Sequence, residues 1–341
     1  MDMESAPQSM IDRVTQGQHL SRHEMAAVIS SIMQGEWPEA QIAALLTALR
    51  LKGETVEEIA GAAIAMRRHM TPIRSSHPIL VDTCGTGGDA SGTFNISTAA
   101  ALVTAAAGVP VAKHGNRAIT SKTGSADVLA ALGVNIEAPV SVVERCLEEV
   151  GIGFCFAPQL HPSMKHVAAV RRQLGVPTIF NLLGPLCNPA GAPFQVLGAG
   201  NDRLRDRLSA ALALLETRRA VVVTGADGLD EVTLSTVTRV TEIRDGERFE
   251  RTWEPADFGF QMQELNALRV SGPVESAAVI RHILAGERGP ARDIVLLNAA
   301  AALWVAGVSA DLKECTARAA QAIDSGSARR VLQRLVEIGA Q

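Results

Sequence analysis

The stretch VDTCGTGGDASGTFNIST, from Val81 to Thr98, decides how this sequence folds. An apolar, strand-like run leads into it, and an Ala-rich, helix-like run follows. Its four glycines are Gly85, Gly87, Gly88 and Gly92. Glycine lets a ligand approach the main chain, and the start of a helix offers free amide N–H groups to an anion. The stretch therefore predicts a phosphate-binding turn, although a Gly-rich turn with an ordinary helix cap explains this loop equally well by itself.

The composition describes a globular chain. Its 341 residues are 47% hydrophobic, which is enough for a large core or two packed units. A net charge of −4 and only 3% aromatic residues argue against a nucleic-acid partner. The five cysteines include no C-x-x-C pair, which favours a reducing, cytoplasmic setting over zinc or disulfides. We also expect no signal peptide, no membrane span and no membrane partner.

The periodicity of apolar residues changes once along the chain. Between about residues 20 and 70 they recur every three or four positions, which predicts a small helical unit. Thr71 to Pro78 is rich in proline and serine and reads as a linker or hinge. Beyond it, short apolar runs alternate with helix-like runs, and Val237 to Glu254 has the pattern of a hairpin around Asp245-Gly246. This order predicts an α/β fold with a mainly parallel sheet flanked by helices.

Two further loops follow strand-like runs. KHGNRAITSKTGSADVL, from Lys113 to Leu129, combines positive charge with many hydrogen-bond donors, as a polyanion requires. VVVTGADGLDEVTLS, from Val221 to Ser235, carries Asp227, Asp230 and Glu231, whose oxygens suit Mg²⁺ held together with substrate phosphates. Each loop alone reads more readily as a solvated charged surface. Because the carboxyl ends of parallel strands line one crevice, three such loops favour one shared site.

These motifs resemble anthranilate phosphoribosyltransferases. The resemblance rests on DTCGTGGD, TFNIST, KHGNR, SKTGSADVLAALG, HPSMKHVAAVRRQLG, TIFNLLGPLCNPAG and DGLDEVTLS, which occur in the family's order and spacing. It implies transfer of the phosphoribosyl group of phosphoribosyl pyrophosphate (PRPP) to the amine of anthranilate, a step of tryptophan biosynthesis, with Mg²⁺ as cofactor and a homodimer as the usual assembly. It implies a nucleoside phosphorylase/phosphoribosyltransferase-like fold, with a small helical domain of residues 1–75 that is completed by about 160–188. The large α/β PRPP-binding domain would comprise residues 76–159 and 189–341.

The resemblance also assigns site residues, position by position. The PRPP contacts fall on Gly85, Gly88, Asp89, Thr93, Asn95, Ile96, Ser97, Thr98, Lys113, His114, Gly115, Asn116, Arg117, Ala118, Ile119, Thr120, Ser121 and Ser125. The metal ligands fall on Ser97, Asp230 and Glu231, and the anthranilate contacts on Gly85, Asn116 and Arg171. No side chain is assigned as a nucleophile. His114 is a candidate to orient substrate or act as a weak base, and a purely structural histidine is an equal alternative.

The sequence departs from the family pattern at three positions, and two rival functions remain open. Pro177 stands where many relatives carry a basic residue, Thr120 replaces a common serine, and Cys187 a common threonine. A pyrimidine nucleoside phosphorylase shares the architecture, but its glycine motif differs from GTGGDASGTFNIST. A non-catalytic, nucleic-acid-binding relative would show a basic face and degraded metal motifs, whereas this chain keeps Asp230 and Glu231.

Overall fold

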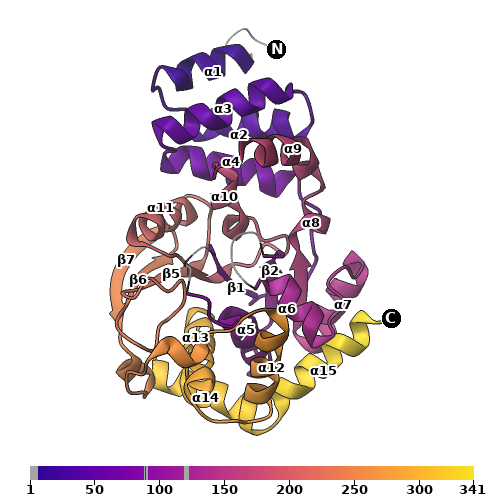
Figure 1. Ribbon diagram of the computed structural model, residues 1–341, viewed down its shortest axis with the longest axis vertical. Coiled ribbons are helices and arrows are strands. Elements are labelled where there is room, and N and C mark those ends of the chain that lie inside the picture. Colours follow the sequence, from indigo (N-terminus) through magenta and orange to yellow (C-terminus); the bar gives the residue numbers. More distant parts are fainter. Residues whose placement is uncertain (1–6, 88, 90, 119–122) are drawn as a thin grey trace.

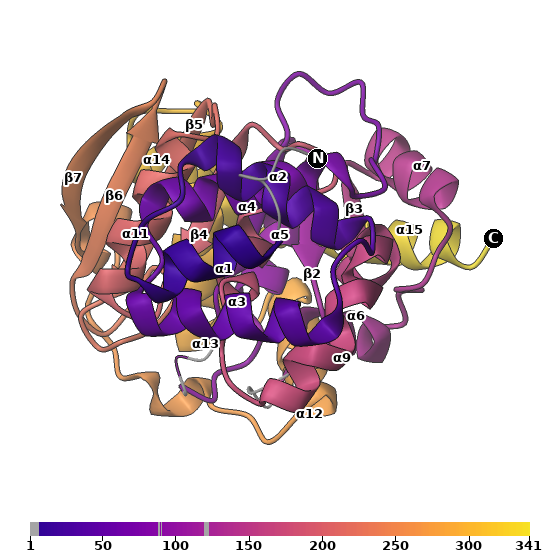
Figure 2. The ribbon, with the colours of Figure 1, turned by 90° about the horizontal axis from the view of Figure 1, so that it is seen from above.

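The computed structural model describes residues 7–87, 89, 91–118 and 123–341. A helical part sits above a larger part that is built on a β-sheet (Figure 1). Seen from above, the helical part lies over the middle of the sheet (Figure 2). No helix in these described ranges is long and apolar enough to cross a membrane.

The helical part begins with four helices that pack on one apolar core. They are α1 (Pro7–Thr15), α2 (Arg22–Met33), α3 (Glu39–Lys52) and α4 (Val56–Arg68). Ser21 and Thr55 start α2 and α4 with capping boxes, in which Glu24 and Glu58 complete the reciprocal hydrogen bonds. The predicted small helical unit is confirmed, and α1 extends it toward the N-terminus.

A later segment of the chain returns to this helical part. It contains α8 (Ala157–Leu160), α9 (Lys165–Leu174) and α10 (Phe180–Leu183). Val167 of α9 and Phe180 of α10 are buried in the same apolar cluster as Ile29 and Leu45 of the N-terminal helices. Figure 1 shows α9 beside α2 and α4, with α10 just below them. The chain therefore passes between the two parts three times: from α4 to the sheet, from the sheet through α8 to α9, and from α10 back to the sheet.

The larger part contains a seven-stranded sheet in the order β3-β2-β1-β4-β5-β6-β7. Its strands are β1 (Val81–Gly85), β2 (Val111–Gly115), β3 (Ile152–Phe156), β4 (Phe194–Gly198), β5 (Arg219–Gly225), β6 (Thr238–Arg244) and β7 (Glu247–Trp253). The first five in this order along the sheet are parallel, while β6 and β7 are antiparallel. Asp245 and Gly246 both have positive φ in the β6–β7 turn, as the Asp-Gly pair predicts. The predicted mainly parallel sheet and its hairpin are confirmed.

Helices cover both faces of the sheet. They are α5 (Ile96–Ala106), α6 (Ser125–Leu132), α7 (Val140–Val150), α11 (Asp202–Ala213), α12 (Pro273–Leu284), α13 (Pro290–Val305), α14 (Leu312–Asp324) and α15 (Ser327–Gly339). The long apolar helices α5 and α13 pack in the core of one face. On the other face, Leu208 of α11 joins the apolar cluster of the helical part. Because β1, β2, β4 and β5 are buried on both faces, their ends are the places where polar side chains can gather.

Candidate functional site

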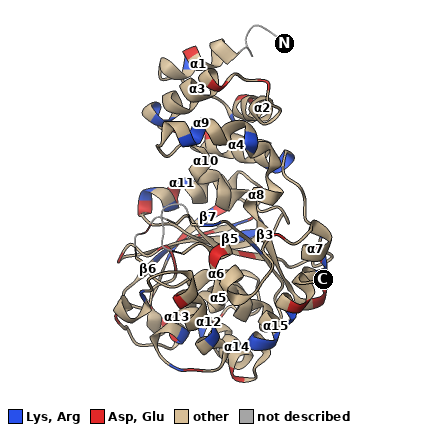
Figure 3. Ribbon diagram, turned by 45° about the vertical axis from the view of Figure 1, so that its right-hand side comes forward, with Lys and Arg blue, Asp and Glu red and all other residues tan. Residues whose placement is uncertain are grey.

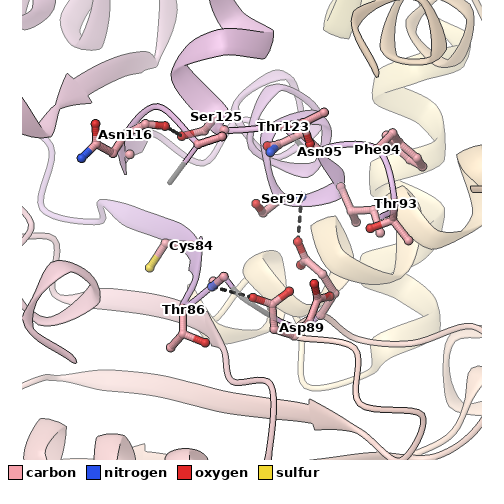
Figure 4. Close-up of a pocket in the computed structure, with 18 of the residues that line it drawn as sticks. Cys84, Thr86, Asp89, Thr93, Phe94, Asn95, Ser97, Asn116, Thr123 and Ser125 are labelled. Atoms are coloured by element: carbon pink, nitrogen blue, oxygen red, sulfur yellow. Dashed lines mark hydrogen bonds between the residues drawn. The ribbon is translucent and has the colours of Figure 1, made fainter. Parts of the chain in front are cut away.

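A cavity of about 640 Å³ opens at the carboxyl ends of β1 and β2. Its walls come from the glycine-rich loop after β1, the start of α5, the loop between β2 and α6, and the loop after β5. Figure 4 shows Asn116, Ser125 and Thr123 along one wall, with Cys84, Thr86 and Asp89 along the opposite one. The three loops that sequence reasoning singled out thus share one pocket, and its volume suits a small-molecule substrate.

Two glycines let the acidic loop lie directly against the strand ends. A Cβ atom on Gly198 would lie 1.6 Å from the carbonyl oxygen of Asp230, and one on Gly85 would lie 2.6 Å from Asp230 Oδ2. These two glycines are neighbours, because Gly85 pairs with Gly198 in the β1–β4 register. Any side chain at either position would push the acidic loop out of the pocket. Glycine is needed here for close approach.

The two carboxylates of the acidic loop reach across to the glycine loop and to α5. The amide of Gly87 donates to Asp230 Oδ2 at 2.9 Å, and the amide of Ser97 donates to Glu231 Oε1 at 3.0 Å (Figure 4). Burial, together with the charge of Asp89, raises the pKa of Asp230 to about 7. Burial and the charge of Asp230 raise the pKa of Glu231 to about 8. Negative charges crowded into a poorly solvated wall call for a cation.

Several main-chain amides of the glycine loop already have protein partners. The amide of Thr86 donates to the carbonyl of Gly198 at 2.9 Å, and that of Ser91 donates to Asp89 Oδ1 at 3.2 Å. The expectation of an open amide cradle is therefore too simple, because the loop folds onto its own acceptors and onto Asp230. Thr86 Oγ1, in contrast, is buried and has no hydrogen-bond partner among the described residues. A substrate oxygen would satisfy this hydroxyl.

Lys113 places a buried positive charge beneath the carboxylates. Its side chain is 2% exposed, and Nζ donates to the carbonyl oxygen of Thr83 at 2.6 Å and to Ser97 Oγ at 3.4 Å. Burial lowers the pKa of Lys113, while the charges of Asp82 and Glu231 oppose that shift. The lysine thus holds Ser97 and balances part of the negative charge of the wall.

His114 lines the pocket, but both of its ring nitrogens are engaged. Nδ1 lies 3.1 Å from the carbonyl oxygen of Gly184 and must carry the proton, because a carbonyl only accepts. Nε2 lies 3.2 Å from Nε2 of His161, which must then be the donor. Burial and the neighbouring His161 lower the pKa of His114 to about 3. This geometry favours the structural alternative for His114 over a weak base.

One carboxylate closes the basic loop between β2 and α6. Oδ2 of Asp127 accepts from the amides of Ala118 at 2.8 Å and Gly124 at 3.3 Å, so it fastens the two ends of the loop together. Arg117 pairs with Asp127 at 3.3 Å and lies over the ring of Phe156. Asp127 was not among the predicted site residues. Its position three residues after Gly124, in the first turn of a helix, is the signal that could have indicated it.

The structure brings most of the predicted site residues into this one pocket. They are Gly85, Asp89, Thr93, Asn95, Ile96, Ser97, Lys113, His114, Gly115, Asn116, Arg117, Ala118, Ser125, Asp230 and Glu231. Those that fall outside the described residues are Gly88, Ile119, Thr120 and Ser121. Additional lining residues that sequence reasoning did not assign are Cys84, Thr86, Gly87, Ser91, Gly92, Phe94, Thr123 and Gly124.

Three predicted positions lie elsewhere. Thr98 is fully buried and donates its hydroxyl to the side-chain oxygen of Asn95, so it positions Asn95 instead of lining the pocket. Asp227 accepts from the Thr233 hydroxyl at 2.6 Å and shapes its own loop, apart from Asp230 and Glu231. Arg171 lies on α9, outside the pocket, because α9 packs with the N-terminal helices.

Comparison with known proteins assigns this architecture to a family. The helical bundle domain of a glycosyl transferase family matches residues 8–70, and its a/b domain matches residues 77–329. An anthranilate phosphoribosyltransferase of Thioalkalivibrio sulfidiphilus is 52% identical over 340 residues, which cover 100% of this chain and 99% of the relative. An anthranilate phosphoribosyltransferase of Moorella thermoacetica is 51% identical over 328 residues, which cover 96% of this chain and 97% of the relative. The chain belongs to the anthranilate phosphoribosyltransferase family.

Solved structures of anthranilate phosphoribosyltransferases share the whole fold. The crystal structure from Thermus thermophilus matches with a TM-score of 0.91 at 44% identity, covering 97% of this chain and 99% of that one. The Saccharomyces cerevisiae enzyme in complex with PRPP and Mg matches with a TM-score of 0.88 at 30% identity, covering 99% of both chains. The same yeast enzyme in complex with 4-fluoroanthranilate matches with a TM-score of 0.85 at 28% identity, again covering 99% of both chains. The resemblance drawn from the motifs is confirmed, and the phosphorylase and non-catalytic alternatives fall away.

Proposed function

We propose that the pocket at the ends of β1 and β2 is where this pentosyltransferase moves the phosphoribosyl group of PRPP to the amine of anthranilate, giving N-(5-phosphoribosyl)anthranilate and pyrophosphate in tryptophan biosynthesis. The observation that carries the proposal is the convergence of Asp230 and Glu231 with the glycine loop and Lys113 in one cavity. Binding of PRPP with and without Mg²⁺, measured by isothermal titration calorimetry, tests it. PRPP binding that is indifferent to Mg²⁺ would contradict this assignment.

PRPP carries several phosphate groups and a ribose, and the pocket offers partners for both. The side chains of Thr86, Ser91, Thr93, Asn116 and Ser125 line it as neutral hydrogen-bond donors. The charge of Lys113 and the hydroxyl groups of the glycine loop would stabilise the pyrophosphate end of PRPP, which becomes negative as it leaves. We place PRPP along these loops because the donors lie on both walls of the cavity, where one extended substrate can reach them.

The acidic wall fits Mg²⁺. Asp230 and Glu231 each use one oxygen for an amide hydrogen bond, which leaves the second carboxylate oxygen of each for a cation. In the described part of the chain, no three His, Cys, Asp or Glu side chains gather into a metal cluster. This suits Mg²⁺, which is usually held by one or two carboxylates together with substrate phosphates and water. We propose that Asp230, Glu231 and Ser97 hold it. When bound, Mg²⁺ supplies positive charge opposite the leaving pyrophosphate.

The raised pKa values predict how the need for Mg²⁺ depends on pH. Carboxyl groups of the unfolded chain ionise near pH 4. The metal-free folded chain keeps protons on Asp230 up to about pH 7 and on Glu231 up to about pH 8. Between about pH 4 and 8 the folded chain therefore holds more protons than the unfolded chain, so its free energy of unfolding falls as the pH rises through this range. Because Mg²⁺ competes with these protons, we expect the Mg²⁺ concentration for half-maximal activity to fall about tenfold or more between about pH 6 and 8.

Mg²⁺ titrations of initial rate at several pH values, with PRPP saturating, measure this effect. Free Mg²⁺ must be held by a buffer, since PRPP and pyrophosphate also bind the metal. A half-maximal Mg²⁺ concentration that stays constant over this range would contradict ionisation of these two carboxyls as the cause.

Anthranilate carries a carboxylate and an aromatic ring, and Arg171 is the proposed carboxylate partner. Its guanidinium lies 5.6 Å from the centre of the Phe180 ring, and Nη2 donates to Asn181 Oδ1 at 3.5 Å. The guanidinium retains further N–H donors, which suit a carboxylate. Because Gly85 and Asn116 line the pocket and Arg171 does not, this assignment requires anthranilate to bind between the pocket and α9.

Arg171→Ala is expected to raise the KM for anthranilate about 10- to 100-fold and to leave kcat and the KM for PRPP nearly unchanged, because a carboxylate clamp serves mainly binding. Steady-state kinetics in each substrate measure the two KM values separately. Arg172→Ala, which removes the exposed neighbour on the same helix, is the matched control. If only the KM for PRPP changed, Arg171 would belong to the other substrate.

The chemistry needs no side-chain nucleophile. The lone pair of the anthranilate amine forms the new bond to the anomeric carbon while the bond from that carbon to the pyrophosphate oxygen breaks, and the amine then loses a proton. An aromatic amine is a weak nucleophile, so stabilising the departing charge matters most. We assign that task to Lys113 and the hydroxyl groups of the loops, whereas His114 holds its proton on Nδ1 against the carbonyl oxygen of Gly184.

Other features of the function follow from the family and remain proposals. We propose a homodimer, which is the usual assembly of the family, and a cytoplasmic location, which suits the five free cysteine thiols. The division into a small domain of residues 1–75 with about 160–188 and a large domain of 76–159 and 189–341 also stays a prediction. The joint apolar cluster of α1 to α4 with α9 and α10 supports it.

A further inference from the structure

A second cavity, of about 380 Å³, lies between the helical part and α11. Its walls come from the end of α3, the loop before α4, the segment around α10 and the first turns of α11, and it shares no lining residue with the substrate pocket. We infer that this cavity is a separate binding site for a small oxyanion, a phosphate or a carboxylate. The inference does not depend on the proposed substrate assignments.

Positive charge on the cavity wall exceeds negative charge. Arg207 is neutralised, because its Nη2 pairs with Glu54 Oε2 at 2.9 Å. Arg50 donates from Nη1 to the carbonyl oxygen of Pro177 at 2.5 Å, which leaves its charge without a carboxylate. Arg203 is exposed and has no ion pair or side-chain hydrogen bond within the described ranges. The helix α11, which forms one wall, carries both basic and acidic residues (Figure 3). Two uncompensated guanidinium groups suit an oxyanion.

A buried hydroxyl on the same wall lacks a partner. Thr178 is 4% exposed, and its Oγ1 has no hydrogen bond among the described residues. Its amide is satisfied, because it donates to Asn181 Oδ1 at 3.0 Å. An unsatisfied buried hydroxyl is costly, so such a group is normally met by water or a ligand. An oxyanion next to the two arginines would accept this hydrogen bond.

The N-terminus of α11 adds a partial positive charge to the cavity. Asn201 caps this 12-residue helix by accepting from the amide of Leu204 at 2.9 Å, and both residues line the cavity. The charge of Asp202 in the first turn is offset by Arg205 and Arg239, each 2.8 Å from its Oδ1. The partial positive charge of the helix N-terminus therefore remains available to an anion.

The site would join the two parts of the molecule. An occupant that contacts Arg50 of α3 and Arg203 of α11 bridges the helical part and the sheet part. The wall also adjoins both proposed substrate positions. On the anthranilate side, the lining residue Asn181 accepts a hydrogen bond from Arg171. On the PRPP side, the lining residue Asn201 follows Gly200, which lies next to Asp89. Occupancy is thus placed to influence how the two parts approach each other.

Calorimetric titration of the full chain with inorganic phosphate and, separately, with benzoate tests the inference. PRPP and Mg²⁺ are kept saturating to fill the PRPP position, and the benzoate titrations are made in the Arg171→Ala background so that the proposed anthranilate position does not capture the probe. We expect one of the two probes to bind once per chain, and Arg203→Gln to weaken that binding about tenfold or more. Binding of phosphate alone would identify a phosphate-type occupant, and binding of benzoate alone a carboxylate.

Two further variants make the test specific. Thr178→Val removes the unpartnered hydroxyl at nearly constant volume, so it should weaken the same binding several-fold without lowering the melting temperature. Arg172→Gln removes an exposed charge on α9 that lies outside both cavities, so this variant should bind the probe as the wild-type chain does. Absence of binding by either probe, or equal weakening by Arg203→Gln and Arg172→Gln, would overturn the inference.

Discussion

Asp230→Asn is expected to lower turnover about a hundredfold and to raise the Mg²⁺ concentration for half-maximal rate about tenfold, because it removes a charge worth several kcal/mol of transition-state stabilisation. The amide oxygen of asparagine can still accept from the Gly87 amide, so the loop keeps its anchor while the charge disappears. Initial rates over a range of Mg²⁺ concentrations, with PRPP saturating, measure both changes.

Asp227→Asn is the matched control for that variant. Asp227 lies on the same loop but directs its carboxylate to the Thr233 and Ser235 hydroxyls, away from the pocket. We expect its variant to keep the wild-type Mg²⁺ dependence, with at most a small loss of stability. An unchanged Mg²⁺ titration for Asp230→Asn would remove Asp230 from the metal site.

Gly198→Ala is expected to lower the free energy of unfolding by about 3 kcal/mol and to lower activity at least a hundredfold. The new Cβ would lie 1.6 Å from the carbonyl oxygen of Asp230. Neither atom can rotate away, because the oxygen is part of the main chain and Cβ is bonded to it, so β4 or the acidic loop must move. A displacement of about 1 Å at catalytic groups is enough for such a loss of rate. Thermal or denaturant unfolding together with kcat/KM records the two effects.

Gly272→Ala controls for the general effect of adding a methyl group. Gly272 precedes α12, and a Cβ there would meet no atom within 4 Å. We expect a change of at most about 1 kcal/mol in unfolding free energy and none in activity. If Gly198→Ala behaved like this control, the close contact between β4 and the acidic loop would not exist in solution.

Local patterns in the sequence were sufficient for most of the helices and strands and for the three loops, although they missed α1. The Asp245-Gly246 turn, the capping box at Thr55 and Glu58, and the strands that end at glycine loops all depend on neighbouring residues. The family motifs then placed most of the pocket, because each motif stands at the end of one strand. Thr98 shows what such motifs leave open: two hydroxyl residues, Ser97 and Thr98, are adjacent, and only the fold decides that Ser97 lines the pocket while Thr98 is buried. Its contact with PRPP stays a prediction.

Contacts between distant residues could not be predicted from the sequence. Gly87 and Asp230 are 143 positions apart, and the bond between them depends on β4 lying between β1 and β5. The engagement of His114 by His161 depends on α8 returning across the end of β2. The second cavity likewise arises where α3, α10 and α11 meet. Such sites follow from strand order and domain packing, which leave no local periodicity.

The most direct test of the proposed reaction follows anthranilate fluorescence after PRPP is added to the enzyme, first with Mg²⁺ and then with excess chelator. We expect a loss of anthranilate fluorescence that requires the enzyme, PRPP and Mg²⁺ together and stops when the metal is chelated. Unchanged fluorescence with a folded protein, or a loss that continues at full rate in excess chelator, would contradict it.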